Sequence, residues 1–153
     1  MTLTFKRFGA LIAVTGLALL FMLATPAQAQ NSNLALSAAD TARVRSAVQS
    51  QLAAFAKDDG PKAFSYAAPN VRKRLGTPAA FLDMVRRSYP VVYRPATTAF
   101  LTVEGAGNLA VQRVQMQDAA GAAYLATYTL ARQNDKTWRI TGCEVTVNKG
   151  QTA

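Results

Sequence analysis

The residues of this chain that could best form a catalytic pair are a tyrosine and a carboxylate near its end. Trp138, Ile140 and Glu144 stand at even spacings in a strand-like segment, so strict alternation places them on one face. Tyr128 could approach Glu144 from the preceding segment of the same kind. A tyrosine and a carboxylate in an apolar pocket can act as an acid and a base. Both are catalytic candidates, although Glu144 near a strand end also fits an exposed surface residue.

Residue types exclude most other catalytic systems. The chain has no histidine and a single cysteine, Cys143. It therefore lacks Ser-His-Asp and Cys-His nucleophiles, most zinc sites, and any disulfide within the chain. Strict alternation points Cys143 away from Trp138, where it is either a reactive thiol or a small buried hydrophobe. We expect no metal and no cofactor.

Positive charge gathers in the middle of a basic chain, which has 17 Lys and Arg against 8 Asp and Glu. The cluster consists of Arg72, Lys73, Arg74, Arg86, Arg87 and Arg94, and only Asp83 lies among them. It predicts either an anion-binding face for an anionic envelope component, or a solvated helix surface. Nucleic acid is a poor partner because the cluster lacks interleaved aromatic residues for base stacking.

Two further groups of residues are candidates for a site. Asp58 and Asp59 could bind a cation or act as an acid–base pair, but the Gly60-Pro61 that follows favours a turn and a helix cap. Apolar side chains predicted to face the interior could line a pocket for a small apolar ligand. These pocket candidates are Phe55, Tyr66, Trp138 and Ile140.

The first 29 residues are typical of a secretory signal peptide. Lys6-Arg7 precedes an apolar run from Ala10 to Leu23, and Ala27-Gln28-Ala29 forms a signal-peptidase site. A membrane anchor is the alternative, but this run is shorter than the ~20 residues that span a bilayer. We therefore predict cleavage after Ala29 and an exported protein, periplasmic or secreted, with no transmembrane segment after cleavage.

The elements that must position these residues are helices followed by strands. Helices are predicted over 37–57, from Pro61, over 69–75 and over 78–89, with caps at Ser37 and Thr77 and an extended connector over 91–95. The first helix carries an apolar stripe, Val44, Val48, Leu52 and Phe55. Strands are predicted over 97–104, 109–117, 123–132 and 137–147. This order predicts one α+β domain over 37–148, with N-terminal helices packed on a curved four-stranded antiparallel sheet. We expect residues 30–36 to form a flexible lead-in and residues 149–153 to form a disordered tail.

The segment from Gln51 to Pro95 resembles a bacterial family known as domain of unknown function 4864. The similar features are an AF…DD…AF.YAAP pattern, a G.P..F..MV helix and a Y..V.RP exit. Helices followed by a sheet also resemble the cone fold of the nuclear transport factor 2-like superfamily, as does the WRI sequence from Trp138 to Ile140. That resemblance implies a curved sheet that wraps a long helix and encloses a pocket, although this chain has no strand pair between its helices.

These observations favour a small exported binding or interaction module without catalysis. The alternatives are a small-pocket acid–base enzyme, an isomerase or hydrolase that uses Glu144 and Tyr128, and a structural envelope protein held by its basic face. A pocket that contains Glu144 would favour the enzyme. The identity of the ligand and the oligomeric state have no signal in the sequence.

Overall fold

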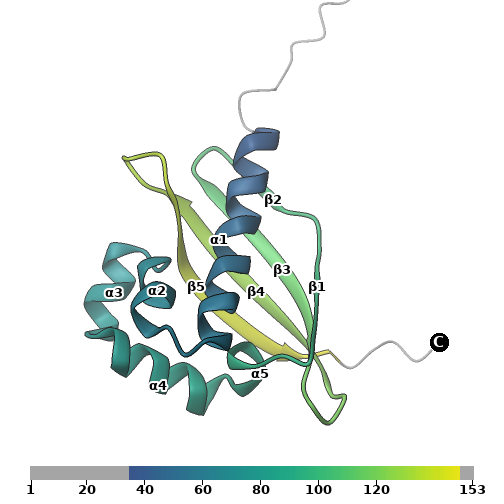
Figure 1. The fold of residues 1–153 in the computed structure, drawn as a ribbon. Coiled ribbons are helices and arrows are strands. Elements are labelled where there is room, and N and C mark those ends of the chain that lie inside the picture. The colour runs from purple at the N-terminus through teal and green to yellow at the C-terminus, as the bar shows by residue number, and fades with distance from the viewer. Residues whose placement is uncertain (1–34, 149–153) are drawn as a thin grey trace, which may run out of the picture.

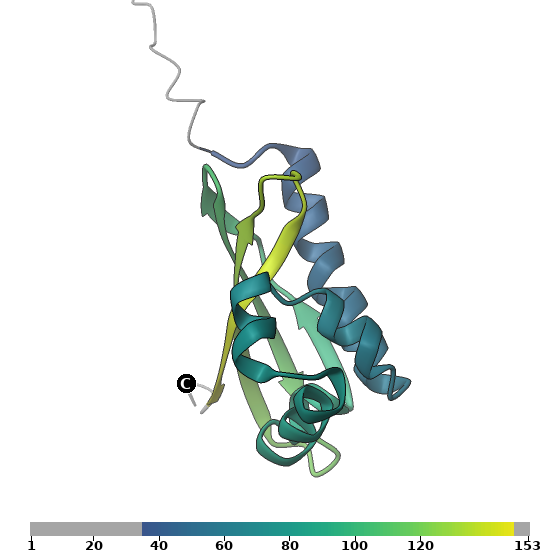
Figure 2. The same cartoon turned by 90° about the vertical axis from the view of Figure 1, so that its left-hand side faces the viewer.

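A computed structural model describes residues 35–148, so the expected signal peptide and the expected tail at 149–153 lie outside the described residues. Its helices are α1 (Ala38–Ala56), α2 (Gly60–Ser65), α3 (Pro69–Leu75), α4 (Pro78–Ser88) and α5 (Pro90–Tyr93). Its strands are β1 (Thr97–Phe100), β2 (Glu104–Ala106), β3 (Leu109–Gln117), β4 (Ala123–Arg132) and β5 (Trp138–Val147). The helices lie on one face of the sheet (Figures 1 and 2), so the α+β prediction is confirmed.

Helix α1 crosses the sheet and supplies the centre of the core. Ser37 caps it, because its hydroxyl accepts a hydrogen bond from the Asp40 amide at 3.0 Å and donates one to the Asp40 carboxylate at 2.9 Å. The predicted stripe is buried along its whole length, at Val44, Val48, Leu52 and Phe55. These side chains join one cluster with Trp138 and Ile140 of β5, as the helical period predicts.

A buried polar contact ties the start of α1 to the start of β5. The indole nitrogen of Trp138 donates a hydrogen bond to the Asp40 carboxylate at 3.0 Å. The guanidinium groups of Arg43 and Arg132 lie 3.3 and 3.6 Å from the same carboxylate. The hydrogen bond from Trp138, followed by that from Ser37, lowers the pKa of Asp40. Trp138 is therefore a core residue held by a charge-assisted hydrogen bond.

A proline stands in the first turn of each of the four helices that follow, as the first residue of α3, α4 and α5 and the second of α2. Asp59 caps α2 by accepting from the Lys62 amide, and Thr77 caps α4 in the same way, as predicted. The extended connector predicted over 91–95 is wrong, because Pro90 opens α5 as well as following α4. Proline has no N–H to lose at a first helical position, and the turn buries Val91 and Val92.

The sheet is antiparallel in the order β1-β3-β4-β5, and β2 also pairs with β3. The single strand predicted over 97–104 is wrong, since it is divided into β1 and β2 and the sheet has five strands. The register shifts by one residue between Phe100↔Val114 and Glu104↔Val111. At this shift the buried Gln112 side chain donates to the Leu101 carbonyl at 2.8 Å. That bond gives a partner to a main-chain carbonyl between β1 and β2, and so stabilises the interruption of the strand.

The chain joins the fold earlier than predicted. Ala35, within the expected flexible lead-in, bridges to Ala106 of β2, and Leu36 packs against the core. A Cβ atom on Gly105 would lie 2.4 Å from the Leu109 carbonyl oxygen and 2.8 Å from Leu36. Only glycine fits this close approach of three segments.

Candidate functional site

A β-bulge in β5 decides which side chains reach the interior. Ile140 pairs with Leu130, but Gly142 pairs with Thr129, so Thr141 is an extra residue in β5. An extra residue moves the following side chains to the opposite faces of a sheet. Cys143 consequently packs against the core together with Trp138 and Ile140, and the expectation that it points away from Trp138 is wrong.

The same bulge separates the two catalytic candidates. Tyr128 faces the core and is 1% exposed, and it pairs with Cys143 on β5. Glu144 is the next residue, so it projects from the opposite face and is exposed. The expectation that Tyr128 approaches Glu144 is therefore wrong. The expectation that Glu144 shares a strand face with Ile140 is wrong as well. Their arrangement supports no shared acid–base chemistry.

A small cavity lies between β5 and the helices, with a volume of about 170 Å³. This volume is close to that of an engineered apolar cavity, roughly 150 Å³, that binds benzene. Its lining comes from α1, α3, α4, α5, β4 and β5 and the segment before α3. The lining residues are Gln51, Phe55, Ala67, Val71, Arg74, Leu75, Phe81, Met84, Val85, Tyr89, Val92, Tyr128, Ile140, Thr141, Gly142 and Cys143.

A main-chain contact brings α3 to this cavity. Ile140 donates its amide hydrogen to the Tyr66 carbonyl at 2.9 Å, and its carbonyl accepts from the Ala68 amide at 2.8 Å. These two bonds attach the segment before α3 to the edge of β5, beside the bulge. Val71 and Leu75, one turn of α3 apart, then face the cavity.

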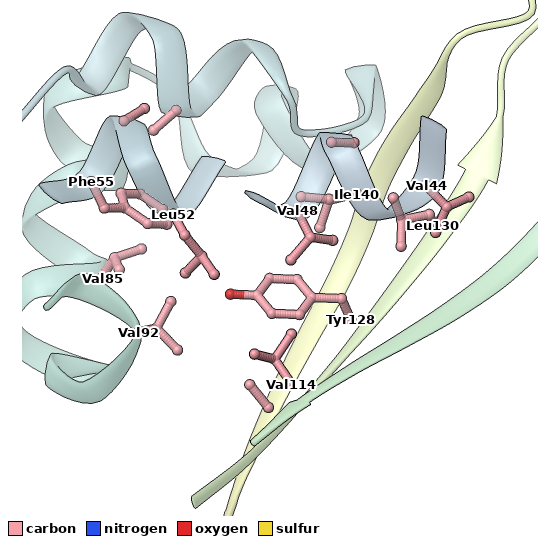
Figure 3. Close-up of a cluster of buried hydrophobic side chains, with 14 of the residues drawn as sticks. Val44, Val48, Leu52, Phe55, Val85, Val92, Val114, Tyr128, Leu130 and Ile140 are labelled. Carbon is pink, nitrogen blue, oxygen red and sulfur yellow. The ribbon is translucent and has the colours of Figure 1, made fainter. Parts of the chain in front are cut away.

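The hydroxyl of Tyr128 is the polar group inside the cavity wall that lacks a partner. In Figure 3 it points away from β4, toward the side on which Leu52, Val85 and Val92 lie. It is buried and makes no hydrogen bond to an oxygen or nitrogen atom within the described residues, and only the Cys143 thiol, a weak partner, lies beside it. Burial raises the pKa of Tyr128 well above its usual value, and the nearby Cys143 adds to the effect. A buried donor without a partner costs about 1–3 kcal/mol, which a bound acceptor would recover.

Arg74 supplies the charge of the cavity. It stands on α3 between Val71 and Leu75, and its exposed side chain lines the rim. It is the one lining residue of formal charge, because burial raises the pKa of the Cys143 thiol to about 12 and that of Tyr128 is raised as well. Both groups are therefore neutral at pH 7.

Only two of the four pocket residues expected from the sequence line this cavity. Phe55 and Ile140 line the cavity, whereas Trp138 and Tyr66 do not. Sequence reasoning missed the contribution of Val71 and Arg74. The sequence contained a pattern that could have predicted it. Residues 71, 74 and 75 are spaced by three and four positions and therefore lie on one face of a helix.

The six clustered cations do not form one free surface. Asp58 accepts hydrogen bonds from Arg86 at 3.1 Å, from Arg94 at 2.9 Å and from the Tyr93 hydroxyl. Both guanidinium groups also lie about 5 Å from the Tyr93 ring centroid. The hydrogen bond from Tyr93, followed by that from Arg86, lowers the pKa of Asp58. The expectation that Asp83 alone opposes the cluster is therefore wrong, and Asp58 joins α4 to the end of α5.

The favoured interpretation of Asp58 and Asp59, a turn and a helix cap, is confirmed, and the two carboxylates do not act as a pair. Asp59 is engaged as the cap of α2, while Asp58, in a left-handed conformation with φ of 55°, holds two arginines. Elsewhere in residues 35–148, no group of three or more cysteine and acidic side chains is placed to hold a metal ion.

Two larger surface grooves differ from this cavity because they contain no unpartnered buried polar group. A wide groove of about 610 Å³ lies between α1 and β1, and another of about 430 Å³ lies between α5, the start of β4 and the end of β5. No buried polar atom without a partner lies among the lining residues of either groove. Among the helices of residues 35–148, none combines the length and the apolar character needed to cross a membrane.

Comparison with known proteins gives one match. A family model described as "Domain of unknown function (DUF4864)" matches residues 37–153. No curated protein matches the chain, and no solved structure matches it. The family match covers every helix and strand described above.

Proposed function

We propose a function for this chain from its own geometry, because it belongs to the DUF4864 family, whose description assigns no activity. The protein is a non-catalytic binding module that takes a small, mostly apolar ligand into the cavity between β5 and the helices. The observation that carries this proposal is the buried hydroxyl of Tyr128, which has no partner stronger than the Cys143 thiol at the wall of a cavity of about 170 Å³. A ligand with one hydrogen-bond acceptor would satisfy it.

The acid–base enzyme finds no support in the arrangement of the strands. Glu144 is not among the lining residues of the cavity, and the bulge turns it to the opposite face of β5 from Tyr128. Side chains that could move protons at neutral pH are the usual mark of a small hydrolytic or isomerising site. Tyr128 and Cys143, with raised pKa values, suit hydrogen bonding better than proton transfer.

Phenol is a suitable first probe, because it combines an apolar ring with one hydroxyl. We expect phenol to raise the melting temperature of the wild-type protein in a concentration-dependent way, as any ligand of the native state does. The Val71→Phe variant should lose this response, because the larger side chain fills the cavity from α3. Val147→Phe, an equal change at an exposed valine outside the cavity, should retain it.

A second measurement uses the unaltered protein. Methyl NMR spectra of the wild type should show shifts on phenol addition at Val71, Val85 and Ile140, which line the cavity. Val44 and Val111 are matched controls outside it and should not shift. The absence of any thermal response in the wild type, or shifts at the control valines alone, would overturn the proposal.

We also propose that the protein is exported and works outside the cytoplasm. The support is the run from Ala10 to Leu23 followed by the cleavage pattern that ends at Ala29. Expressed in a bacterium, the protein should be recovered from the periplasmic fraction with Gln30 as its first residue. The intact mass of that fraction tests this, and a full-length chain retained in the membrane would contradict it.

A further inference from the structure

The rim of the cavity carries a cation where an apolar residue would complete the wall. Val71, Arg74 and Leu75 share one face of α3, and all three line the cavity. A helix that only packs against a core carries apolar residues on that face. An arginine at this position instead adds an exposed, positively charged side chain to the lining of an otherwise uncharged pocket.

Arg74 has no counter-ion in the described part of the chain. The ion pairs of residues 35–148 use the carboxylates of Asp40, Asp58, Asp83 and Glu104, and Arg74 takes part in none of them. Its neighbours on α3, Arg72 and Lys73, are cations as well. The potential at the mouth is therefore positive, and no carboxylate within the cavity offsets it.

The interior of the cavity makes this charge more effective. Its walls are chiefly apolar side chains, and Tyr128 and Cys143 in them are neutral at pH 7, because burial raises their pKa values. Electrostatic attraction is stronger beside a wall of low dielectric constant than in open water. Such a pocket favours an anion at its mouth over a neutral group and disfavours a cation.

We propose that the ligand of this cavity is a short amphipathic carboxylate, whose mostly apolar body fills the cavity and offers one hydrogen-bond acceptor to Tyr128, and whose carboxylate binds Arg74 at the rim. This inference rests on the proposed function and adds the charge and polarity of the ligand to it. An arginine binds a carboxylate through two parallel hydrogen bonds, which selects it over an amide of the same shape.

Phenylacetate and phenylacetamide test the preference for a carboxylate at the rim, because they share one ring and differ in charge. We expect the wild-type protein to bind phenylacetate about three- to tenfold more tightly at low salt, as an exposed but charge-assisted contact allows. Isothermal titration calorimetry measures both affinities. In Arg74→Gln the two affinities should become equal through loss of phenylacetate binding, with phenylacetamide unchanged.

The matched control is Lys73→Gln, which removes the same charge from the adjacent position of α3 but not from the lining of the cavity. It should keep the preference for phenylacetate. Equal binding of the two probes by the wild type would overturn the inference and leave the proposed function standing. An equal loss in Lys73→Gln and Arg74→Gln would also overturn it, because the preference would then come from the general positive field. Binding of neither probe, together with no response to phenol, would overturn the proposed function itself.

Discussion

Replacement of Phe55 by alanine should lower the free energy of unfolding by about 3–5 kcal/mol. Phe55 is 1% exposed at the C-terminal end of α1, and its ring centroid lies 5.6 Å from that of Phe81, which in turn contacts Phe64. Truncation removes this aromatic contact and enlarges a cavity that already exists. A domain of this size is stable by roughly 5–15 kcal/mol, so the loss is a large part of the total.

Urea unfolding followed by the fluorescence of Trp138, the single tryptophan, measures this loss. Gln49→Ala is the control, because Gln49 is an exposed residue of the same helix. Its effect should stay within about 0.5 kcal/mol, as for most surface substitutions. A loss below about 1 kcal/mol for Phe55→Ala would contradict the burial of α1, since truncation of a packed aromatic residue costs more.

Replacement of Tyr128 by phenylalanine should have the opposite sign and stabilise the empty protein by about 1–3 kcal/mol, the cost of a buried group without a partner. The hydroxyl is buried and makes no hydrogen bond to an oxygen or nitrogen atom within residues 35–148, while the ring packs in the core. The variant keeps the ring and removes only the unsatisfied oxygen. Urea unfolding without ligand is the measurement.

The same variant should weaken ligand binding, which separates it from a simple stabilising change. Phenol, which can accept a hydrogen bond from Tyr128, should bind about three- to tenfold more weakly to Tyr128→Phe. Benzene, which lacks that group, should bind equally to both proteins. Stabilisation with unchanged phenol affinity would place the probe away from the hydroxyl.

Tyr124→Phe is the matched control for both measurements. Tyr124 is half-buried and donates a hydrogen bond to Asp118 at 3.3 Å, so its removal should cost a little stability and leave phenol binding unchanged. Destabilisation by Tyr128→Phe would show that the hydroxyl has a partner in solution. The observation that carries the proposed function would then be withdrawn.

Local chemistry was sufficient to predict most of the elements. Ser37 and Thr77 accept hydrogen bonds from amides three residues later, and such caps mark helix starts in any context. The bounds predicted for β3 and β4 agree with the structure, because glycine and aspartate turns separate two runs of alternating residues. The stripe from Val44 to Phe55 was also predictable from local sequence. Apolar residues repeated at the helical period of 3.6 lie on one face of a helix, and that face packs against the core.

Other features depend on contacts between segments that are distant in the sequence. Pro90 continues into α5 because Val91 and Val92 reach the core there, and the strand predicted over 97–104 breaks where Gln112 bonds to Leu101. Thr141-Gly142 carried a local hint, because a glycine inside a strand pattern often marks a bulge. The hint does not say where the extra residue falls.

The candidate site was decided by tertiary structure. The sequence by itself determined that histidine catalysis is absent, that cations cluster, and that apolar residues near Phe55 and Ile140 face inward. It could not determine that Cys143 rather than Glu144 shares the face of Ile140, because one inserted residue exchanges the two faces of a strand. The sequence also could not determine that Arg74 and Tyr128 line the same cavity. Their proximity depends on the hydrogen bonds between Ile140 and the segment before α3, which place α3 beside the edge of the sheet.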